Sequence, residues 1–196
     1  MAKPSHPLRF RPGSAKEESK PPLPSMPSVN DTIAALATPA GTSAIALIRV
    51  SGPDTRDLVL ALRQGREPKP RLASHGDYFS LEGKRLDDVL YTFFEGPHSY
   101  TGEDLLELGC HGNPYIVQLI IEDLFKRGCR PAEPGEFTQR AFLGGRMDLS
   151  QAEAVMDIIH ARSERALSAA QDQLRGSLGR RMDELIQELL MALAQL

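Results

Sequence analysis

The sequence predicts an α+β fold, in which a mixed β-sheet with packed helices is followed by a long helical arm. Short apolar runs separated by turn-forming glycine and proline fill the first half of the chain, a pattern typical of strands joined by tight connections. In the second half, apolar residues recur at intervals of three and four, which indicates amphipathic helices. With 196 residues, 41% of them hydrophobic, the chain can form one ordinary domain and an extension.

The first predicted elements lie directly after residue 30. The runs TIAALAT and SAIALIRVS, on either side of a turn-type sequence, predict two strands over 32–38 and 43–51. Pro53 predicts the start of a helix over 53–64, since proline is tolerated at the first helical position. The following stretch, 76–95, predicts a strand, a turn and a second strand.

One further strand and a well-marked helix complete the predicted domain. The strand covers 104–111, and the helix covers 114–127 with apolar residues at helical spacing. Asn113 supplies an N-cap and Pro114 a first helical residue. Gly128 is expected to end this helix.

The predicted arm begins with a short helix over 134–143. Asp148 or Ser150 can cap a much longer helix, whose apolar stripe continues toward residue 196 and is weakened in its middle by Gly176 and Gly179. Such a bare apolar face requires a partner, so we expect the arm to continue in a longer parent protein or to pack against another copy.

Charge and composition set the N-terminal segment apart. Residues 1–29 are rich in proline, serine and lysine and poor in aliphatic residues, so we expect a disordered tail. The tail carries five Lys or Arg against two Glu, which gives +3, and the net charge of −3 therefore leaves −6 for the rest. An acidic body argues against a large nonspecific nucleic-acid surface.

Several classes of protein are disfavoured by what the sequence omits. Two cysteines without a CxxC pair fit a reducing, cytoplasmic location, and no apolar run approaches the ~20 residues of a membrane span. The only Gly-Lys pair, Gly83-Lys84, has Tyr78 and Arg85 where a phosphate-binding loop needs glycine and Ser or Thr. We therefore expect that the chain neither binds nor hydrolyses GTP.

The stretch TGEDLLELGCHG contains the residues most suggestive of chemistry. Cys110 and His111 are adjacent on a predicted strand and point to opposite faces, so they cannot readily act together as nucleophile and base. Cys110 is most simply a buried hydrophobic residue, and His111 a strand-end histidine with a hydrogen-bond partner.

Glu107 lies mid-strand on a partly apolar face, where an unpaired carboxylate is costly. It is either half of an internal salt bridge or a carboxylate presented to a ligand with two parallel N–H groups, such as a pterin. Arg49, at the end of its strand, and Arg146, after two glycines, are its candidate companions. Either arginine could contact a carboxylate tail or a ring oxygen, or could simply be a surface or ion-pair residue.

Three long motifs then point to a family. DTIAALATPAGTSAIALIRVSG, GPHSYTGEDLLELGCHGNP and PGEFTQRAFLGGRMDLSQAEAVMDII together resemble the N-terminal region of the tRNA-modification GTPases called MnmE or TrmE. The match covers 31 to about 160 closely, and the arm resembles the start of that family's central helical domain. The resemblance implies a folate-binding and dimerisation domain over 30–147 and a truncated helical domain over 148–196.

The resemblance also implies a fold similar to the tetrahydrofolate-binding domain of the glycine-cleavage T-protein. In this family a one-carbon-carrying tetrahydrofolate binds near the interface of a homodimer, and a partner flavoprotein, MnmG, joins in modifying the wobble uridine of tRNA. GTP, potassium and magnesium belong to the G domain of the full-length family protein, whose motifs do not occur here. Whether the chain by itself is an enzyme stays open.

The folate-site residues carry over to Arg49, Glu107 and Arg146, although the family usually has Lys where Arg146 stands and Asn where Gly144 stands. Two other functions remain open at this point. One is a stand-alone folate-dependent one-carbon transferase, in which Asp148 or Glu103 would handle a proton. The other is a pure protein-interaction domain.

Overall fold

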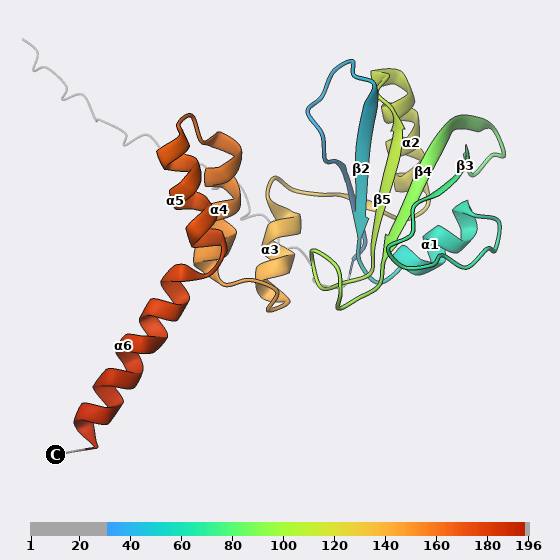
Figure 1. The fold of residues 1–196 in the computed structure, drawn as a ribbon. Helices are drawn as coiled ribbons and strands as arrows, with labels where there is room; N and C mark the ends of the chain where they lie inside the picture. Colours follow the sequence, from blue (N-terminus) through green and yellow to red (C-terminus); the bar gives the residue numbers. More distant parts are fainter. Residues whose placement is uncertain (1–30, 195–196) are drawn as a thin grey trace, which may run out of the picture.

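The computed structural model describes residues 31–194, so the predicted disordered tail lies outside the described residues. It contains a six-stranded mixed sheet with helices packed on it and a helical arm leading away from it (Figure 1). This confirms the predicted α+β class. The strand order is β3-β4-β5-β2-β1-β6, and the strands are β1 (Ile33–Leu36), β2 (Ile45–Ser51), β3 (Ser74–Phe79), β4 (Arg85–Phe94), β5 (Leu105–His111) and β6 (Arg130–Pro131).

Alternation along the central strands separates a covered face of the sheet from an open one. On β2 and β5, every second residue, such as Ile48 or Leu108, is buried in the core beneath helices α1 (Thr55–Leu62) and α2 (Pro114–Lys126). The residues between them, Arg49 and Glu107 included, point to the opposite face, where most side chains are only partly buried. The candidate site residues of the central strands therefore lie on the open face.

The helix α2 begins as the sequence predicts. The Asn113 side chain accepts a hydrogen bond from the Tyr115 N–H at 2.9 Å, and Pro114 is the first helical residue. The expected start of α1 at Pro53 is wrong by two positions, because Asp54 occupies the N-cap and the helix begins at Thr55. The two-residue strand β6, which pairs in parallel with β1, was not predicted, since two residues show no periodicity.

The arm is not the single long helix that the apolar stripe predicted. After α3 (Glu136–Leu143), it forms α4 (Leu149–His160), α5 (Glu164–Leu174) and α6 (Ser177–Leu193). Ser163 breaks the stripe by capping α5 through its hydroxyl, which accepts from the Ala166 N–H at 3.2 Å. Gly176 adopts φ +75° and separates α5 from α6.

Helices α4 and α5 instead form an antiparallel hairpin, while α6 extends away from it (Figure 1). The side-chain amide of Gln151 donates to the Leu174 carbonyl at 2.8 Å, and that of Gln173 donates to the Ser150 carbonyl at 3.0 Å. Asp148 caps α4 in a capping box with Gln151, as one of the two predicted caps. No helix between residues 31 and 194 is long and apolar enough to cross a membrane.

Candidate functional site

The two predicted site residues of the central sheet face each other. Strands β2 and β5 pair antiparallel, with Arg49 directly opposite Glu107. The Arg49 Nη2 and Nε atoms donate to the same carboxylate oxygen, Oε1 of Glu107, at 2.6 and 3.1 Å. Each side chain is 23% exposed, so the pair is accessible from the open face. The internal salt bridge is thus real, but it engages one side of the carboxylate.

The second oxygen of Glu107, Oε2, accepts no hydrogen bond from any residue between 31 and 194. A carboxylate has about four lone-pair sites, so this oxygen retains capacity for an external donor. Glu107 can therefore be half of an internal salt bridge and still present a carboxylate oxygen to a ligand. Arg49 neutralises the charge from one side, and a ligand N–H can approach from the other.

Two aromatic rings hold the Arg49 guanidinium from outside the sheet. Its Cζ atom lies 5.1 Å from the centre of the Tyr100 ring and 5.7 Å from that of Phe137. Tyr100 belongs to the connection between β4 and β5, and Phe137 to α3. The Tyr100 hydroxyl lies 2.9 Å from Oγ1 of Thr138, which ties that connection to α3. Arg49 is consequently fixed in orientation as well as in charge.

Arg146, the third predicted residue, lies near this arrangement without joining it. Its side chain is exposed and has no hydrogen-bond or ion-pair partner among the described residues. The aliphatic part of its side chain packs against Gly102 in the β4–β5 connection. A Cβ added to Gly102 would lie 3.2 Å from the Arg146 Cγ. Gly102 also adopts φ +84°, which favours glycine at that position. The structure thus brings Arg49 and Glu107 together and places Arg146 beside the connection that carries Tyr100.

A larger ionic group, which the sequence did not predict, lies next to this site. We call it the Arg140 cluster. Arg140 is 5% exposed and donates to the carboxylates of Asp31, Glu136 and Glu103 at 2.6, 3.1 and 3.2 Å. Arg130 adds ion pairs to Asp31 at 2.7 Å and to Glu136 at 2.6 Å. Its members are Asp31, Glu103, Arg130, Glu136 and Arg140, drawn from four separate segments of the chain.

The Arg140 cluster shifts the titration of its carboxylates. The hydrogen bond from Arg130, reinforced by Arg140 and opposed by burial, lowers the pKa of Asp31 from 3.8 to about 2. Burial opposes the same shift at Glu136, but hydrogen bonds from Arg130, the Glu133 N–H and Arg140 hold its pKa below the ordinary value. The only local signal for this cluster was the four-residue spacing of Glu136 and Arg140 on one helix.

Cys110 and His111 take no part in the site. Cys110 is buried in the core, and burial raises the pKa of its thiol to about 11, so the thiol is not a nucleophile at neutral pH. The His111 Nδ1 lies 2.8 Å from a carboxylate oxygen of Asp87, as expected of a strand-end histidine with a partner. No group of three or more His, Cys, Asp or Glu that could hold a metal ion occurs within the part of the chain that the structure describes.

Comparison with known proteins identifies the chain's relatives. A family profile described as "GTP-binding protein TrmE N-terminus" matches residues 32–146, and a second, "MnmE helical domain", matches 149–196. The tRNA modification GTPase MnmE of Opitutus terrae is 62% identical over 170 residues, which cover 87% of this chain and 37% of that protein.

Proteins of the same name from Thermotoga maritima and Akkermansia muciniphila are 47% and 48% identical, over 167 and 168 residues. These matches cover 85% and 84% of this chain, and 37% of each relative. The chain therefore spans little more than a third of the length of the curated relatives that it matches.

Proposed function

The chain belongs to the TrmE/MnmE family of tRNA modification GTPases, and from this premise we propose that it is the family's tetrahydrofolate-binding and dimerisation module. In this proposal, residues 30–147 bind a one-carbon-carrying folate and pair with a second copy, and residues 148–196 begin the helical domain. The observation that supports it best is the Arg49–Glu107 pair, whose carboxylate keeps one oxygen free on an accessible face.

The pair suits a reduced pterin. A pterin presents an exocyclic amino group and a ring N–H side by side, and an ionised carboxylate accepts both through charge-assisted hydrogen bonds. Glu107 offers Oε2 directly, while Arg49, whose guanidinium lies near the Tyr100 and Phe137 rings, holds the carboxylate in its orientation. Arg146, exposed near the same connection, is suited to the carboxylate tail of the folate or to a ring oxygen.

The open face of the sheet also supports the proposed homodimer. It exposes large apolar side chains, with Ile45 at 64% and Leu90 at 47% exposure. Ligand sites usually enclose most of a small molecule, and a flat sheet face alone cannot do so. A second copy laid over this face would cover both the apolar side chains and a ligand bound at Glu107.

Light scattering across a dilution series tests the dimer. We expect a dimer for the parent chain at micromolar concentration, and a monomer for Leu90→Arg, which places a charge in the proposed interface. Leu72→Arg is the matched control, because Leu72 is similarly exposed, at 53%, but lies outside the strands of the sheet. A monomeric parent at high micromolar concentration would refute the proposed pairing.

At the level of the whole protein, we propose that the module supplies the one-carbon unit for modification of the wobble uridine of tRNA, together with an MnmG-like flavoprotein. GTP, potassium and magnesium would then act in the G domain of the full-length protein. A cytoplasmic location agrees with two buried cysteines that are not joined in a disulfide.

The proton-handling role that a stand-alone one-carbon transferase needs is poorly supported. Both carboxylate oxygens of Glu103 accept from Arg140, and Oε2 also accepts from the Ser51 hydroxyl at 2.7 Å. Asp148 is the N-cap of α4. Each proposed carboxylate therefore already has a structural role.

Titration calorimetry of the 196-residue chain with a stable reduced folate tests the central proposal. Saturable binding of one folate per chain, lost in Glu107→Gln, is the expected result. A chain that remains folded and dimeric but gives no saturable heat would leave it as a pure interaction domain, and the proposed folate site would be wrong.

A further inference from the structure

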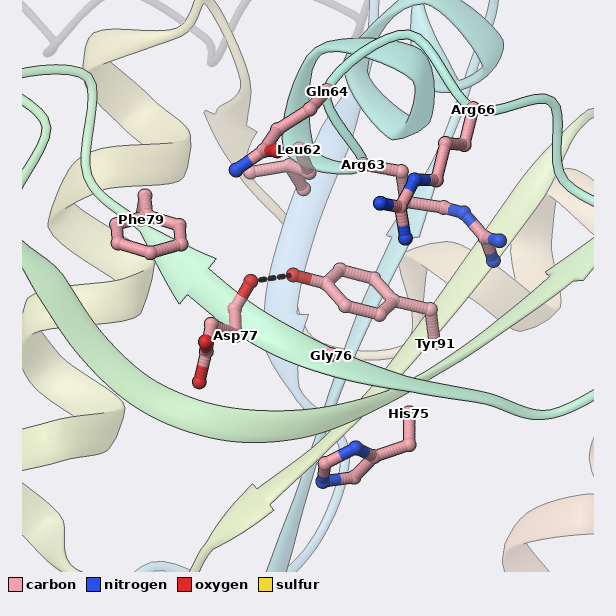
Figure 2. A pocket seen from close by; sticks show the side chains of 9 residues that line it. All are labelled: Leu62, Arg63, Gln64, Arg66, His75, Gly76, Asp77, Phe79 and Tyr91. Atoms are coloured by element: carbon pink, nitrogen blue, oxygen red, sulfur yellow. Dashed lines mark hydrogen bonds between the residues drawn. The ribbon is translucent and has the colours of Figure 1, made fainter.

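A second candidate site lies on the other side of the sheet from the Arg49–Glu107 pair. It is a pocket of about 260 Å³ between the C-terminal end of α1 and the edge strand β3 (Figure 2). Tyr91, whose ring belongs to the covered core, forms part of its wall, and its hydroxyl donates to the Asp77 carbonyl at 2.9 Å. Figure 2 labels its lining residues, among them Arg63, Gln64 and Arg66.

Two cations of this pocket have no acidic partner in the part of the chain that the structure describes. Arg63 and Arg66 project over the Tyr91 side of the pocket in Figure 2, and within residues 31–194 neither side chain makes a hydrogen bond or ion pair. The neighbouring acidic residue, Glu67, pairs with a different arginine, since its Oε2 lies 3.5 Å from Nη1 of Arg56. Their charge is therefore available to an external anion.

The other ionisable groups of the lining already have partners. The Asp77 carboxylate accepts from Arg85 at 2.6 Å, so its negative charge is compensated at the rim. His75 is paired with Asp88. The balance of charge that faces the pocket is thus positive, although the described body of the protein is acidic.

The backbone at the end of α1 forms one side of this pocket. Gln64 adopts φ +56°, in the left-handed region that favours glycine, and its N–H donates to the Ala61 carbonyl at 3.3 Å. The Gly65 N–H donates to the Leu60 carbonyl at 2.7 Å, which completes a Schellman-type end. This helix end places the Gln64 amide over the Phe79 side of the pocket (Figure 2).

We propose that this pocket binds the phosphate group of a nucleotide. Two guanidinium groups offer forked, charge-assisted donors that match phosphate oxygens, and the Gln64 amide offers a third donor from the opposite side. The volume lies just below the ~300 Å³ at which pockets for drug-sized ligands begin, which suits a phosphate and its adjoining sugar or ring. A free nucleotide and an RNA strand both carry such a group.

The test separates these two sources. The full 196-residue chain is titrated at low salt with AMP by calorimetry, and with a short fluorescein-labelled single-stranded RNA by anisotropy, with inorganic phosphate as competitor. Saturable binding of both probes identifies the nucleotide phosphate itself as the ligand. Binding of the RNA alone identifies a phosphate within a strand, and inorganic phosphate should compete in either case.

The double substitution Arg63→Gln/Arg66→Gln should weaken binding roughly tenfold or more, because each arginine supplies charge-assisted hydrogen bonds. Arg162→Gln/Arg165→Gln removes the same charge from exposed positions of the helical arm and should leave affinity nearly unchanged. If both double variants lose affinity equally, or if neither probe binds the parent saturably, the pocket is not a phosphate site.

Gln64→Gly gives a second, independent readout. Glycine relieves the left-handed conformation, so the melting temperature should rise by about 2–4 °C, while loss of the amide should weaken phosphate binding severalfold. A purely structural role for Gln64 predicts the stability change without the affinity change. Unaltered affinity in both Gln64→Gly and Arg63→Gln/Arg66→Gln would overturn the proposal.

Discussion

The Arg49–Glu107 pair and the Arg140 cluster use the same side-chain chemistry to different ends. In the cluster, Glu136 accepts from Arg130 and Arg140 through one oxygen, and from Arg130 and the Glu133 N–H through the other. In the pair, both contacts fall on one oxygen of Glu107. A carboxylate with both oxygens satisfied by its own chain is structural, whereas one with an open oxygen at a surface can accept a ligand.

Burial separates the two regions as clearly as hydrogen bonding does. The side chains of Glu136 and Arg140 are 1% and 5% exposed, against 23% for each member of the pair. Removing one partner of a buried ion pair leaves an uncompensated charge and is strongly destabilising, and this cost falls as solvent screens the pair. Substitutions in the cluster should therefore change stability, and substitutions in the pair should change binding.

The largest expected effect follows from breaking the cluster at its centre. Arg140→Leu removes a cation that contacts Asp31, Glu103 and Glu136, and should lower the free energy of unfolding by about 3–5 kcal/mol. Urea unfolding followed by circular dichroism measures this change. Arg165→Leu, at an exposed position of α5, is the control and should shift stability by less than about 0.5 kcal/mol. Equal small shifts in both variants would show that the cluster does not hold α3 against the sheet.

The second effect is on ligand binding rather than on stability. Glu107→Gln preserves the shape but removes the charge and one acceptor oxygen, and should weaken reduced-folate binding by about 2–5 kcal/mol, on the order of 30- to 3,000-fold. Arg49→Ala should also weaken binding. Titration calorimetry measures the affinities, and the urea midpoint of each variant provides the comparison with Arg140→Leu.

The folded state of these variants decides how the result is interpreted. Cys110→Ala serves as control on the same strand, since it removes a buried atom of the core without touching the open face. Its folate affinity should equal that of the parent, even if its stability falls. Folded Glu107→Gln that binds as tightly as the parent would make Glu107 a structural residue like Glu136.

Acid should distinguish the cluster through Asp31. Because the folded pKa of Asp31 is about 2 and its ordinary value is 3.8, the stabilisation is fully present above pH 4 and is lost as the pH falls toward 2. We expect a contribution of about 1–2 kcal/mol after solvent screening of this partly exposed group. Urea midpoints measured from pH 6 to pH 2 should fall less steeply for Asp31→Asn than for the parent. Parallel curves would show that Asp31 does not contribute to the acid sensitivity.

Some elements of the fold could be predicted from local sequence signals, and others could not. The central strands and α2 were predicted because their apolar spacing and the Asn113–Pro114 start are local signals. The prediction of a single long helix in the arm was wrong. An apolar stripe shows which side of a helix is buried but not whether the helix is continuous, and the Ser163 cap lies within the stripe. Local patterns alone could not bring Arg49 opposite Glu107, because that pairing depends on sheet order.

The Arg140 cluster could not be predicted from the sequence, because its contacts join distant parts of the chain. The contact of Arg140 with Asp31 joins residues separated by 109 positions, and no spacing rule relates them. The proposed folate-site residues could be named because long motifs resemble a family, which is information about relatives rather than about physics. The sequence did not predict the pocket at Arg63 and Arg66, because these residues are of ordinary types and are set apart only by having no acidic partner among residues 31–194.

The smallest expected effect tests whether Arg146 acts by charge or by geometry. Arg146 is exposed and has no ionic partner among residues 31–194, so its replacement should not alter stability. Arg146→Lys keeps the positive charge and an aliphatic stem of similar reach beside Gly102, and should change folate affinity by no more than about twofold. Arg146→Gln removes the charge and should weaken binding by roughly fivefold at most, the range of exposed ion pairs. Calorimetry at low and at high salt measures both variants, because only a charge effect is screened. If Arg146→Lys loses as much affinity as Arg146→Gln, then the planar guanidinium makes a forked contact with the ligand, and Arg146 belongs with Arg49 as a positioned residue of the site.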